Sequence, residues 1–190
     1  MIDIHQIVAQ CKKGDRQAQK QLYEEFAPQL FAVCLRYCRN RMEAEDLLHE
    51  GFIKIFDKIG QYRGEGTINA WLRRIMVNTV LDELRNKQNF LYIDDTESVV
   101  RNIADTNEEN NDNDDKFYDI DINQVFDMVN QMPQQYNLVF NLYVVEKYSH
   151  DKIASELGIS INTSKSNLSR ARKWLKNKLE KEQLKIKKTE

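Results

Sequence analysis

Apolar residues recur every three or four positions along most of the chain, a spacing typical of amphipathic helices. In the first half this pattern predicts four helices with short connections. Asp15 can cap the first, which is expected to run through Phe26, and Pro28 is favoured in the first turn of the second. The third is predicted over about Met42 to Ile59, and Thr67 can cap the fourth, which is expected to run to about Lys87. Four such helices would form a compact bundle.

The predicted core of this bundle comes from the apolar stripes of the third and fourth helices. The core positions of the third helix are expected to be Leu47, Leu48, Phe52, Ile55, Phe56 and Ile59. Those of the fourth are expected to be Trp71, Leu72, Ile75, Val80 and Leu84.

The helical periodicity stops between residues 92 and 121. This stretch includes DTNEENNDNDDKFYD, which is rich in Asn, Asp and Glu and is typical of a flexible, solvated linker. A calcium-binding EF-hand loop is the alternative, but it requires a glycine at its turn and a closing glutamate, and both are absent.

Helical spacing resumes at residue 122 and continues to about Lys181. One helix is expected to end before Pro133 and the next to run from Pro133 to about Glu146. The pattern therefore predicts an all-α fold of two small domains: a helical bundle at 1–91, a flexible acidic linker at 92–121 and a second helical domain at 122–190.

The second domain contains the pattern of a helix-turn-helix. Ser149 can cap a short helix that carries Ala154, Gly158 follows at the turn, and Ser160 or Asn162 can cap the last helix. The small residue allows the two helices to cross closely and the glycine allows the turn. The second helix of such a unit enters the major groove of DNA.

At 100° per residue the last helix has two opposite faces. Its apolar face holds Leu168, Ala171, Leu175 and Leu179, and its polar face holds Lys165, Ser166, Ser169, Arg170, Lys173 and Lys176. We expect Lys165, Ser166 and Ser169 to read base edges. Arg170, Arg172 and Lys173 are expected to hold phosphates. An ordinary solvated, lysine-rich helix surface is the alternative. Trp174 is expected to pack against a neighbouring helix.

The distribution of charge supports the same division of the chain. The formal net charge is only −2 over 190 residues. Residues 1–91 have a net charge of +2, residues 92–121 of −9 and residues 122–190 of +5. A basic block beyond an acidic connector indicates a module that meets a polyanion.

Several classes of protein are disfavoured. No apolar run approaches the roughly 20 residues that span a bilayer, and the first residues lack a signal-peptide pattern, so we expect a cytoplasmic protein without membrane insertion. Cys34 and Cys38 lie one helical turn apart and are expected to be core-facing thiols. Because no partner Cys or His stands at ligand spacing, neither a metal site nor another cofactor is expected.

Two long segments carry a family resemblance. AEDLLHEGFIKIFDKIGQYRGEGTINAWLRRIMVNTVLDELR, from Ala44 to Arg85, resembles region two of bacterial sigma factors of the extracytoplasmic function (ECF) group. The C-terminal block, which includes GISINTSKSNLSRAR, resembles region four of the same group. The resemblance covers most of the chain except the linker, in the order of the family. It implies a dissociable subunit of RNA polymerase that directs promoter-specific initiation and is not an enzyme.

The resemblance also implies partners and site residues. Region two would recognise and melt the minus-ten element, and region four would read the minus-thirty-five element and meet the beta flap of the polymerase. The beta-prime clamp helices would meet the third helix, at Asp46, Leu47, Glu50 and Ile53. The loop Gln61 to Gly66 would receive a flipped base, and the residues expected to contact the minus-ten strand are Tyr62, Arg63, Arg73, Arg74, Asn78 and Arg85. Tyr62 would offer stacking. An anti-sigma factor is a further expected partner.

The sequence departs from the family pattern at a few positions. Ser164 replaces a usual apolar residue in the recognition helix, so we expect looser packing there. Asn167 replaces a usual Arg, Lys147 a frequent Gly, and His49 a frequent Gln. Two further residues are given structural roles: Trp71 as a buried core anchor and Asp82 as a partner of a nearby Arg.

The linker is expected to have a geometric role. A flexible chain of roughly 30 residues spans about 30 Å on average and about 100 Å when extended, so it bridges two promoter elements only if something stretches it. In the family it threads through the RNA channel of the polymerase, and the charge of −9 would mimic RNA there.

Two other functions compete with this interpretation. A DNA-binding regulator that acts without polymerase would explain the second domain but not the first. A metal-dependent nuclease could use the Asp/Glu clusters, but no nucleophile and base occur together and most of the acids lie in the aperiodic linker.

Overall fold

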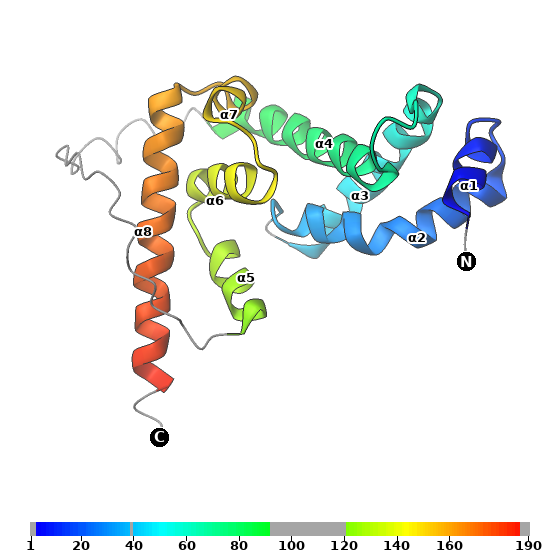
Figure 1. The fold of residues 1–190 in the computed structure, drawn as a ribbon. Coiled ribbons are helices and arrows are strands. Elements are labelled where there is room, and N and C mark those ends of the chain that lie inside the picture. The colour runs from blue at the N-terminus through cyan, green and yellow to red at the C-terminus, as the bar shows by residue number, and fades with distance from the viewer. Residues whose placement is uncertain (1–2, 39, 92–120, 187–190) are drawn as a thin grey trace. The chain divides into compact units, whose positions relative to one another are not determined.

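The computed structural model describes residues 3–38, 40–91 and 121–186. All regular elements in these ranges are helices, which confirms the all-α prediction. The chain divides into two compact units, Met1–Leu84 and Arg85–Glu190 (Figure 1). The predicted linker falls almost entirely on residues 92–120, which lie outside the described residues. Within those ranges, no helix combines the length and the apolar character that crossing a membrane demands.

Within the described residues, the first unit contains four α-helices and one 3-10 turn, and the last helix continues beyond Leu84 into residues grouped with the second unit. They are α1 (Ile4–Cys11), α2 (Arg16–Leu35), α3 (Arg41–Lys58), η1 (Ile59–Gln61) and α4 (Ile68–Leu91). The helix α1 was not predicted. Asp3 caps it by accepting hydrogen bonds from the backbone N–H groups of His5 and Gln6, and Ile7 and Val8 are buried along it.

The predicted break between Phe26 and Pro28 is wrong, because α2 runs through both residues. A proline inside a helix costs about 3 kcal/mol, since it removes one backbone hydrogen bond and crowds the preceding turn. The buried side chains of α2 continue in one register from Leu22 past Pro28 to Leu30 and Cys34. Burial of that uninterrupted face offsets the local cost. The predicted cap at Asp15 is confirmed, as its carboxylate accepts from the backbone N–H of Ala18 at 2.8 Å.

The core of the first unit matches the predicted stripes closely. In α3, Leu47, Leu48, Phe52 and Ile55 are buried and Phe56 is half-buried, and Ile59 at the start of η1 is buried. In α4, Leu72, Val80 and Leu84 are buried, and Trp71 and Ile75 are half-buried. The third helix begins one residue before the predicted Met42, and the fourth begins directly after Thr67, the predicted cap.

Cys34 near the end of α2 is a core thiol as predicted, whereas Cys38, just beyond α2, is only partly enclosed. Cys34 is fully buried and Cys38 is half-buried, and both are free thiols. Burial, followed by the charge that Cys38 would carry, raises the pKa of Cys34 to about 12. Such a thiol stays protonated and unreactive at neutral pH.

Beyond the end of α4, the described part of the second unit contains five helical elements. They are α5 (Ile122–Asn130), α6 (Gln134–Phe140), η2 (Asn141–Val145), α7 (His150–Leu157) and α8 (Ile161–Ile186). The predicted helix from Pro133 to Glu146 exists, but its last turn, η2, is a π-helix. Lys147 then takes a left-handed backbone conformation with φ of 58°, which ends the helix. This is the position where glycine is more usual, because glycine has no Cβ to strain there.

The hydrophobic core of the second unit joins α5, α6 and α8. Val129, Met132 and Ala171 form a buried cluster, and Trp174 packs against it, as predicted. The buried amide of Asn137 donates to the carbonyl of Val129 at 2.8 Å and so satisfies the end of α5.

Candidate nucleic-acid interfaces

The second unit contains the predicted helix-turn-helix. The Ser149 hydroxyl caps α7 by accepting from the backbone N–H of Lys152 at 3.3 Å. Gly158 then takes a left-handed conformation with φ of 66°, which turns the chain between α7 and α8. Of the two candidates for the cap of α8, the structure selects Ser160, whose Oγ accepts from the backbone N–H of Thr163 at 2.9 Å. The α7–turn–α8 geometry therefore follows from local caps and one glycine.

A polar contact that the sequence did not predict joins α7 to α8. Ser164 is 0% exposed, and its Oγ lies 2.9 Å from Nδ1 of His150. The His150 ring also stacks on Tyr143 of η2, with ring centroids 4.6 Å apart. The expectation of loose packing at Ser164 is therefore wrong, because the hydroxyl has a partner and the site is closed. His150 and Ser164 are 14 residues apart, and no sequence pattern links them.

The environment of His150 favours its neutral form. Burial lowers the pKa of His150, and the nearby positive charges of Lys165 and Arg172 lower it further, against an opposing effect of Asp151. His150 of α7 is therefore expected to be uncharged at neutral pH where it contacts Ser164, near the start of α8.

The residues predicted to contact the minus-thirty-five element lie on the outer side of α8. Lys165, Ser166, Ser169, Arg172 and Lys173 are exposed, and Arg170 is half-buried. The Ser166 hydroxyl donates to the carbonyl of Thr163 at 3.1 Å, so in this arrangement it offers its oxygen as an acceptor. Leu168 and Ala171 are buried on the opposite side. The structure therefore brings the predicted cationic residues together on one accessible helix surface.

In the first unit, the loop between η1 and α4 is built around Tyr62. The Tyr62 hydroxyl donates to the carbonyl of Gly66 at 2.9 Å and so closes the loop. Gly64 and Gly66 take left-handed conformations with φ near 80°, which a side chain would strain. Thr67 then caps α4 by accepting from the backbone N–H of Ala70 at 3.3 Å.

The predicted role of Tyr62 in base stacking does not fit its position. Tyr62 is only 6% exposed, and its ring packs on Trp71 of α4 with centroids 5.5 Å apart. A ring enclosed in this way does not present an open face on which a DNA base could stack. Tyr62 is instead the internal support of the loop, while Arg63 is exposed at its tip. A cleft of about 270 Å³ lies between this loop and α1.

Three of the four residues predicted on α4 share one stripe. At 100° per residue, Arg74, Asn78 and Arg85 fall within about 40° of one another. All three are exposed. Arg73 falls about 100° to the side of Arg74 and is half-buried, so it does not extend this stripe.

The exposed side of α3 holds three of the four residues predicted to meet the polymerase. Asp46 and Glu50 are exposed, and Ile53 is 62% exposed, which is unusual for a large apolar side chain. Leu47 is 7% exposed and belongs to the core, which leaves little of its surface for the predicted contact with a partner. The spacing of Asp46, Glu50 and Ile53 places them on one stripe, whereas Leu47 lies one residue away and points inward.

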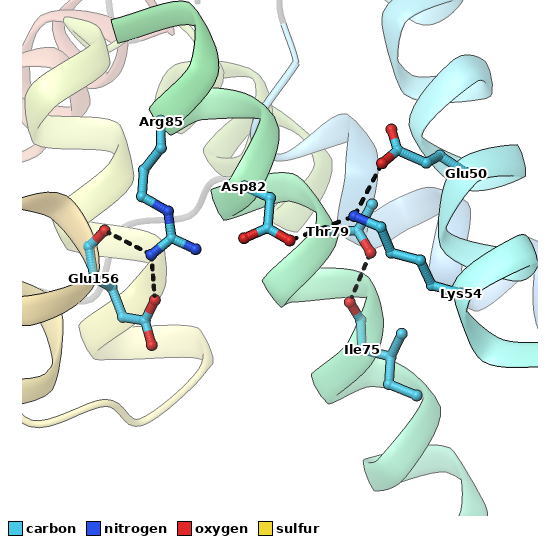
Figure 2. Close-up of polar contacts among 7 residues, drawn as sticks. All are labelled: Glu50, Lys54, Ile75, Thr79, Asp82, Arg85 and Glu156. Atoms are coloured by element: carbon cyan, nitrogen blue, oxygen red, sulfur yellow. Dashed lines mark hydrogen bonds and ion pairs between the residues drawn. The ribbon is translucent and has the colours of Figure 1, made fainter. Parts of the chain in front are cut away.

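Ion pairs connect this surface of α3 to α4 (Figure 2). The Lys54 ammonium donates to Glu50 at 2.9 Å and to Asp82 of α4 at 3.4 Å. Burial opposes the charge on Lys54, but the bonds and charges of Glu50 and Asp82 outweigh it and raise the pKa of Lys54. Asp82 thus has a structural role, with Lys54 as a partner. On the same helix, the buried Thr79 hydroxyl donates to the carbonyl of Ile75.

Comparison with known proteins finds two family models that match separate parts of the chain. The family model described as Sigma-70 region 2 matches residues 22–90, and that described as Sigma-70, region 4 matches residues 122–175. The ECF RNA polymerase sigma factor SigW of Bacillus subtilis is 25% identical over 176 residues, covering 90% of this chain and 94% of its own length. The ECF RNA polymerase sigma-E factor of Haemophilus influenzae is 26% identical over 185 residues, covering 92% and 94%.

Among solved structures, the sigma factor RpoE from Bartonella quintana, in complex with the anti-sigma factor NepR, matches with a TM-score of 0.48 and 22% identity, over 85% of this chain and 96% of that chain. The assignment to a family rests on the sequence comparisons. Two family models match separate parts of the chain, and relatives of one group match nearly its whole length. The chain therefore belongs to the ECF sigma factors of bacterial RNA polymerase.

Proposed function

We propose that this protein binds core RNA polymerase and directs it to promoters, with the first unit acting on the minus-ten element and the second on the minus-thirty-five element. The observation that carries the proposal is the match of both sigma regions along one chain. A regulator that acts without polymerase would have no use for the first unit. The protein acts by binding, in the cytoplasm where promoter DNA and polymerase meet.

The outer side of α8 is proposed to read the minus-thirty-five element in the major groove. Lys165, Ser166 and Ser169 lie within the first three turns, where a recognition helix approaches base edges. Arg170, Arg172 and Lys173 follow and can neutralise phosphates. The neutral His150–Ser164 contact supports this helix from below without adding a charge to the DNA-facing side.

The stripe of Arg74, Asn78 and Arg85 is proposed to follow the unpaired minus-ten strand. From Arg74 to Arg85 it extends about 16 Å along α4, since each residue rises 1.5 Å. Arginines at its two ends suit phosphates, and an amide between them can donate to and accept from a base. The exposed Arg63 of the loop would add a contact at the flipped base. Arg73 is proposed to contribute less, because it lies off the stripe.

The surface formed by Asp46, Glu50 and Ile53 is proposed to bind the beta-prime clamp helices, and the beta flap is a proposed second contact of the polymerase. An exposed isoleucine surrounded by acids offers one apolar anchor and a charge pattern that selects a basic partner. Replacing Ile53 with Asp should abolish binding to core polymerase. Because Ile53 is exposed, the far-UV circular dichroism and thermal unfolding of this variant should match those of the unaltered protein.

Reconstituted transcription tests the proposal directly. The purified chain is added to bacterial core polymerase that lacks other sigma factors, and run-off transcripts are mapped on genomic fragments. Defined start sites that share two upstream elements support the proposal. Binding to DNA without transcripts would instead indicate a plain regulator, and degradation of the template would indicate a nuclease.

A matched pair of variants tests the role of α8. Lys173→Ala should weaken promoter binding across sequences and lower the salt slope by about one, because one phosphate contact is lost. Lys181→Ala removes the same charge from an exposed position of the same helix, about 12 Å further along. It should leave both quantities unchanged. Equal effects of the two variants would indicate only a general electrostatic attraction.

The acidic segment and the anti-sigma factor remain proposals from the family. The segment at 92–121 has a net charge of −9 and is proposed to occupy the basic RNA channel of the polymerase. Replacing its Asp and Glu residues with Asn and Gln should weaken holoenzyme assembly or alter promoter escape. Pull-down from cells, with and without the inducing condition, would identify an anti-sigma partner.

A further inference from the structure

The loop that is proposed to receive the flipped base has a connection to α1 that the family assignment does not explain. Lys12 ends α1, and its Nζ donates to the backbone carbonyl of Tyr62 at 2.6 Å. The same ammonium lies 5.9 Å from the centre of the Tyr62 ring. The two residues are 50 positions apart in the chain, so this contact is made by the tertiary fold.

Tyr62 is the residue through which this contact reaches the rest of the loop. Its hydroxyl holds Gly66 at the far end of the loop, and its ring packs on Trp71 of α4. Its carbonyl, at the near end, is held by Lys12. A displacement of the Tyr62 backbone would therefore move both ends of the loop together.

The loop depends on such support because its own backbone is permissive. Gly64 and Gly66 have φ values of 81° and 79°, and glycine gives the chain access to many other conformations. A pocket selects one base only if its groups are held in place before the base arrives, since ordering them afterwards consumes binding free energy. A charged hydrogen bond at 2.6 Å to the carbonyl of Tyr62 provides part of that order.

We propose that Lys12 is a positioning residue, which holds the loop at residues 61–66 in the shape that discriminates the flipped base. The inference rests on the proposed function of this loop. Lys12 acts through the carbonyl of Tyr62 and makes no contact with DNA itself. Its loss should reduce discrimination between bases and leave the docking of the protein on polymerase intact.

The test measures base discrimination by the holoenzyme. The probe is a single-stranded oligonucleotide with the non-template minus-ten sequence obtained by start-site mapping, compared with the same strand altered at the flipped base. Fluorescence anisotropy gives the ratio of the two Kd values. In Lys12→Met this ratio should fall roughly threefold to tenfold, because only part of the free energy of one charge-assisted hydrogen bond is transmitted to the base. Lys12→Arg, which can still donate to the carbonyl, should retain most of it.

Lys13→Met is the matched control. Lys13 is the next residue, is exposed and carries the same charge, so this variant separates the loss of a charge from the loss of the Tyr62 contact. It should keep the discrimination ratio of the unaltered protein. A second measurement follows the loop itself through the fluorescence of Trp71, with Trp174 replaced by Phe so that Trp71 is the single tryptophan. Iodide should quench this fluorescence more strongly in Lys12→Met than in Lys13→Met, because Tyr62 no longer packs firmly on Trp71.

Two results would overturn the inference. In the first, Lys12→Met retains the full discrimination ratio. In the second, its salt slope falls by about one with the ratio unchanged, which would make Lys12 a phosphate contact. A different result would count against the proposed function: unaltered holoenzyme that neither starts transcription nor distinguishes the two oligonucleotides.

Discussion

The contact between His150 and Ser164 makes a sharp prediction about the recognition helix. At this position a larger apolar residue is usual in the family, so a simple hydrophobic argument predicts that removing the Ser164 hydroxyl stabilises the fold. The structure predicts the opposite. Ser164→Ala would leave Nδ1 of a half-buried His150 without its partner 2.9 Å away.

The magnitude follows from two opposing effects. Leaving a buried polar group without its hydrogen bond costs about 1–3 kcal/mol. Alanine is a better helix former than serine and returns roughly 0.5 kcal/mol. Ser164→Ala should therefore lower the free energy of unfolding of the second unit by about 0.5–2.5 kcal/mol. Ser169→Ala, an exposed position on the same helix, makes the same chemical change without the lost contact and should be neutral or slightly stabilising.

Urea unfolding of the full chain can isolate the second unit. The chain has two tryptophans, Trp71 in the first unit and Trp174 in the second, so replacing Trp71 with Phe leaves a single reporter on α8. His150→Phe keeps an aromatic ring against Tyr143 and needs no partner at Ser164. Combined with Ser164→Ala, it should show a favourable coupling of about 1 kcal/mol.

The pH dependence provides an independent check on the same contact. Because burial and the neighbouring Lys165 and Arg172 lower the pKa of His150 in the folded state, the unfolded chain takes up the proton first as pH falls. Stability of the second unit should therefore be constant above pH 7 and decrease below about 6.5, the ordinary pKa of histidine. His150→Phe should remove this part of the decrease. If Ser164→Ala behaves like Ser169→Ala, and the pH dependence survives in His150→Phe, the reasoning is refuted.

Three further predictions concern packing, backbone strain and thiol chemistry. Gly51→Ala would place a Cβ well inside contact distance of the buried Met76 side chain. The overpacking costs about 1–3 kcal/mol and the higher helix propensity of alanine returns about 1 kcal/mol. Thermal unfolding should therefore show a net loss of stability of about 1 kcal/mol. Gly60→Ala, where a Cβ meets open space, should show no loss, and equal behaviour of the two glycines would contradict the close packing. Lys147→Gly should stabilise the second unit by roughly 0.5 kcal/mol in urea unfolding. Glycine removes the strain of the left-handed backbone at φ 58°, and this gain exceeds the free-energy cost of ordering a more flexible unfolded chain. A loss of stability would count against strain at Lys147. Cys34, with its pKa raised to about 12, should resist iodoacetamide at pH 8 until the protein unfolds, and rapid labelling of the native protein would show that the burial is wrong. Because the thiol ionises near pH 9 in the unfolded chain, the free energy of unfolding should fall above that pH.

Much of the fold could be predicted from local sequence. Asp15, Ser149 and Thr67 cap helices where the pattern placed them, since a cap acts within three residues of itself. Gly158 turns the chain where no other residue would do so without strain. The apolar stripe of α3 is buried almost as expected, because a period of 3.6 residues determines which side chains share a face.

The failures have different causes in each case. The helix through Pro28 continues because a buried face on both sides of it outweighs a local penalty, and no propensity scale includes that burial. Leu47 matched both the core stripe and the family's partner surface, and only its 7% exposure decides between them. The π-helical turn at residues 141–145 has no signal in the sequence that we can identify.

The sequence by itself determined the class of this protein: helical periodicity, a glycine turn before a cationic helix, and two family motifs in order are all properties of consecutive residues. Only the tertiary structure decided what each site is made of. It enclosed Tyr62, paired Ser164 with His150 over 14 positions, and brought Lys12 to a carbonyl 50 positions away. Such contacts depend on how helices pack in three dimensions, and because many pairs of polar residues could meet in principle, spacing along the chain does not identify the pair that does.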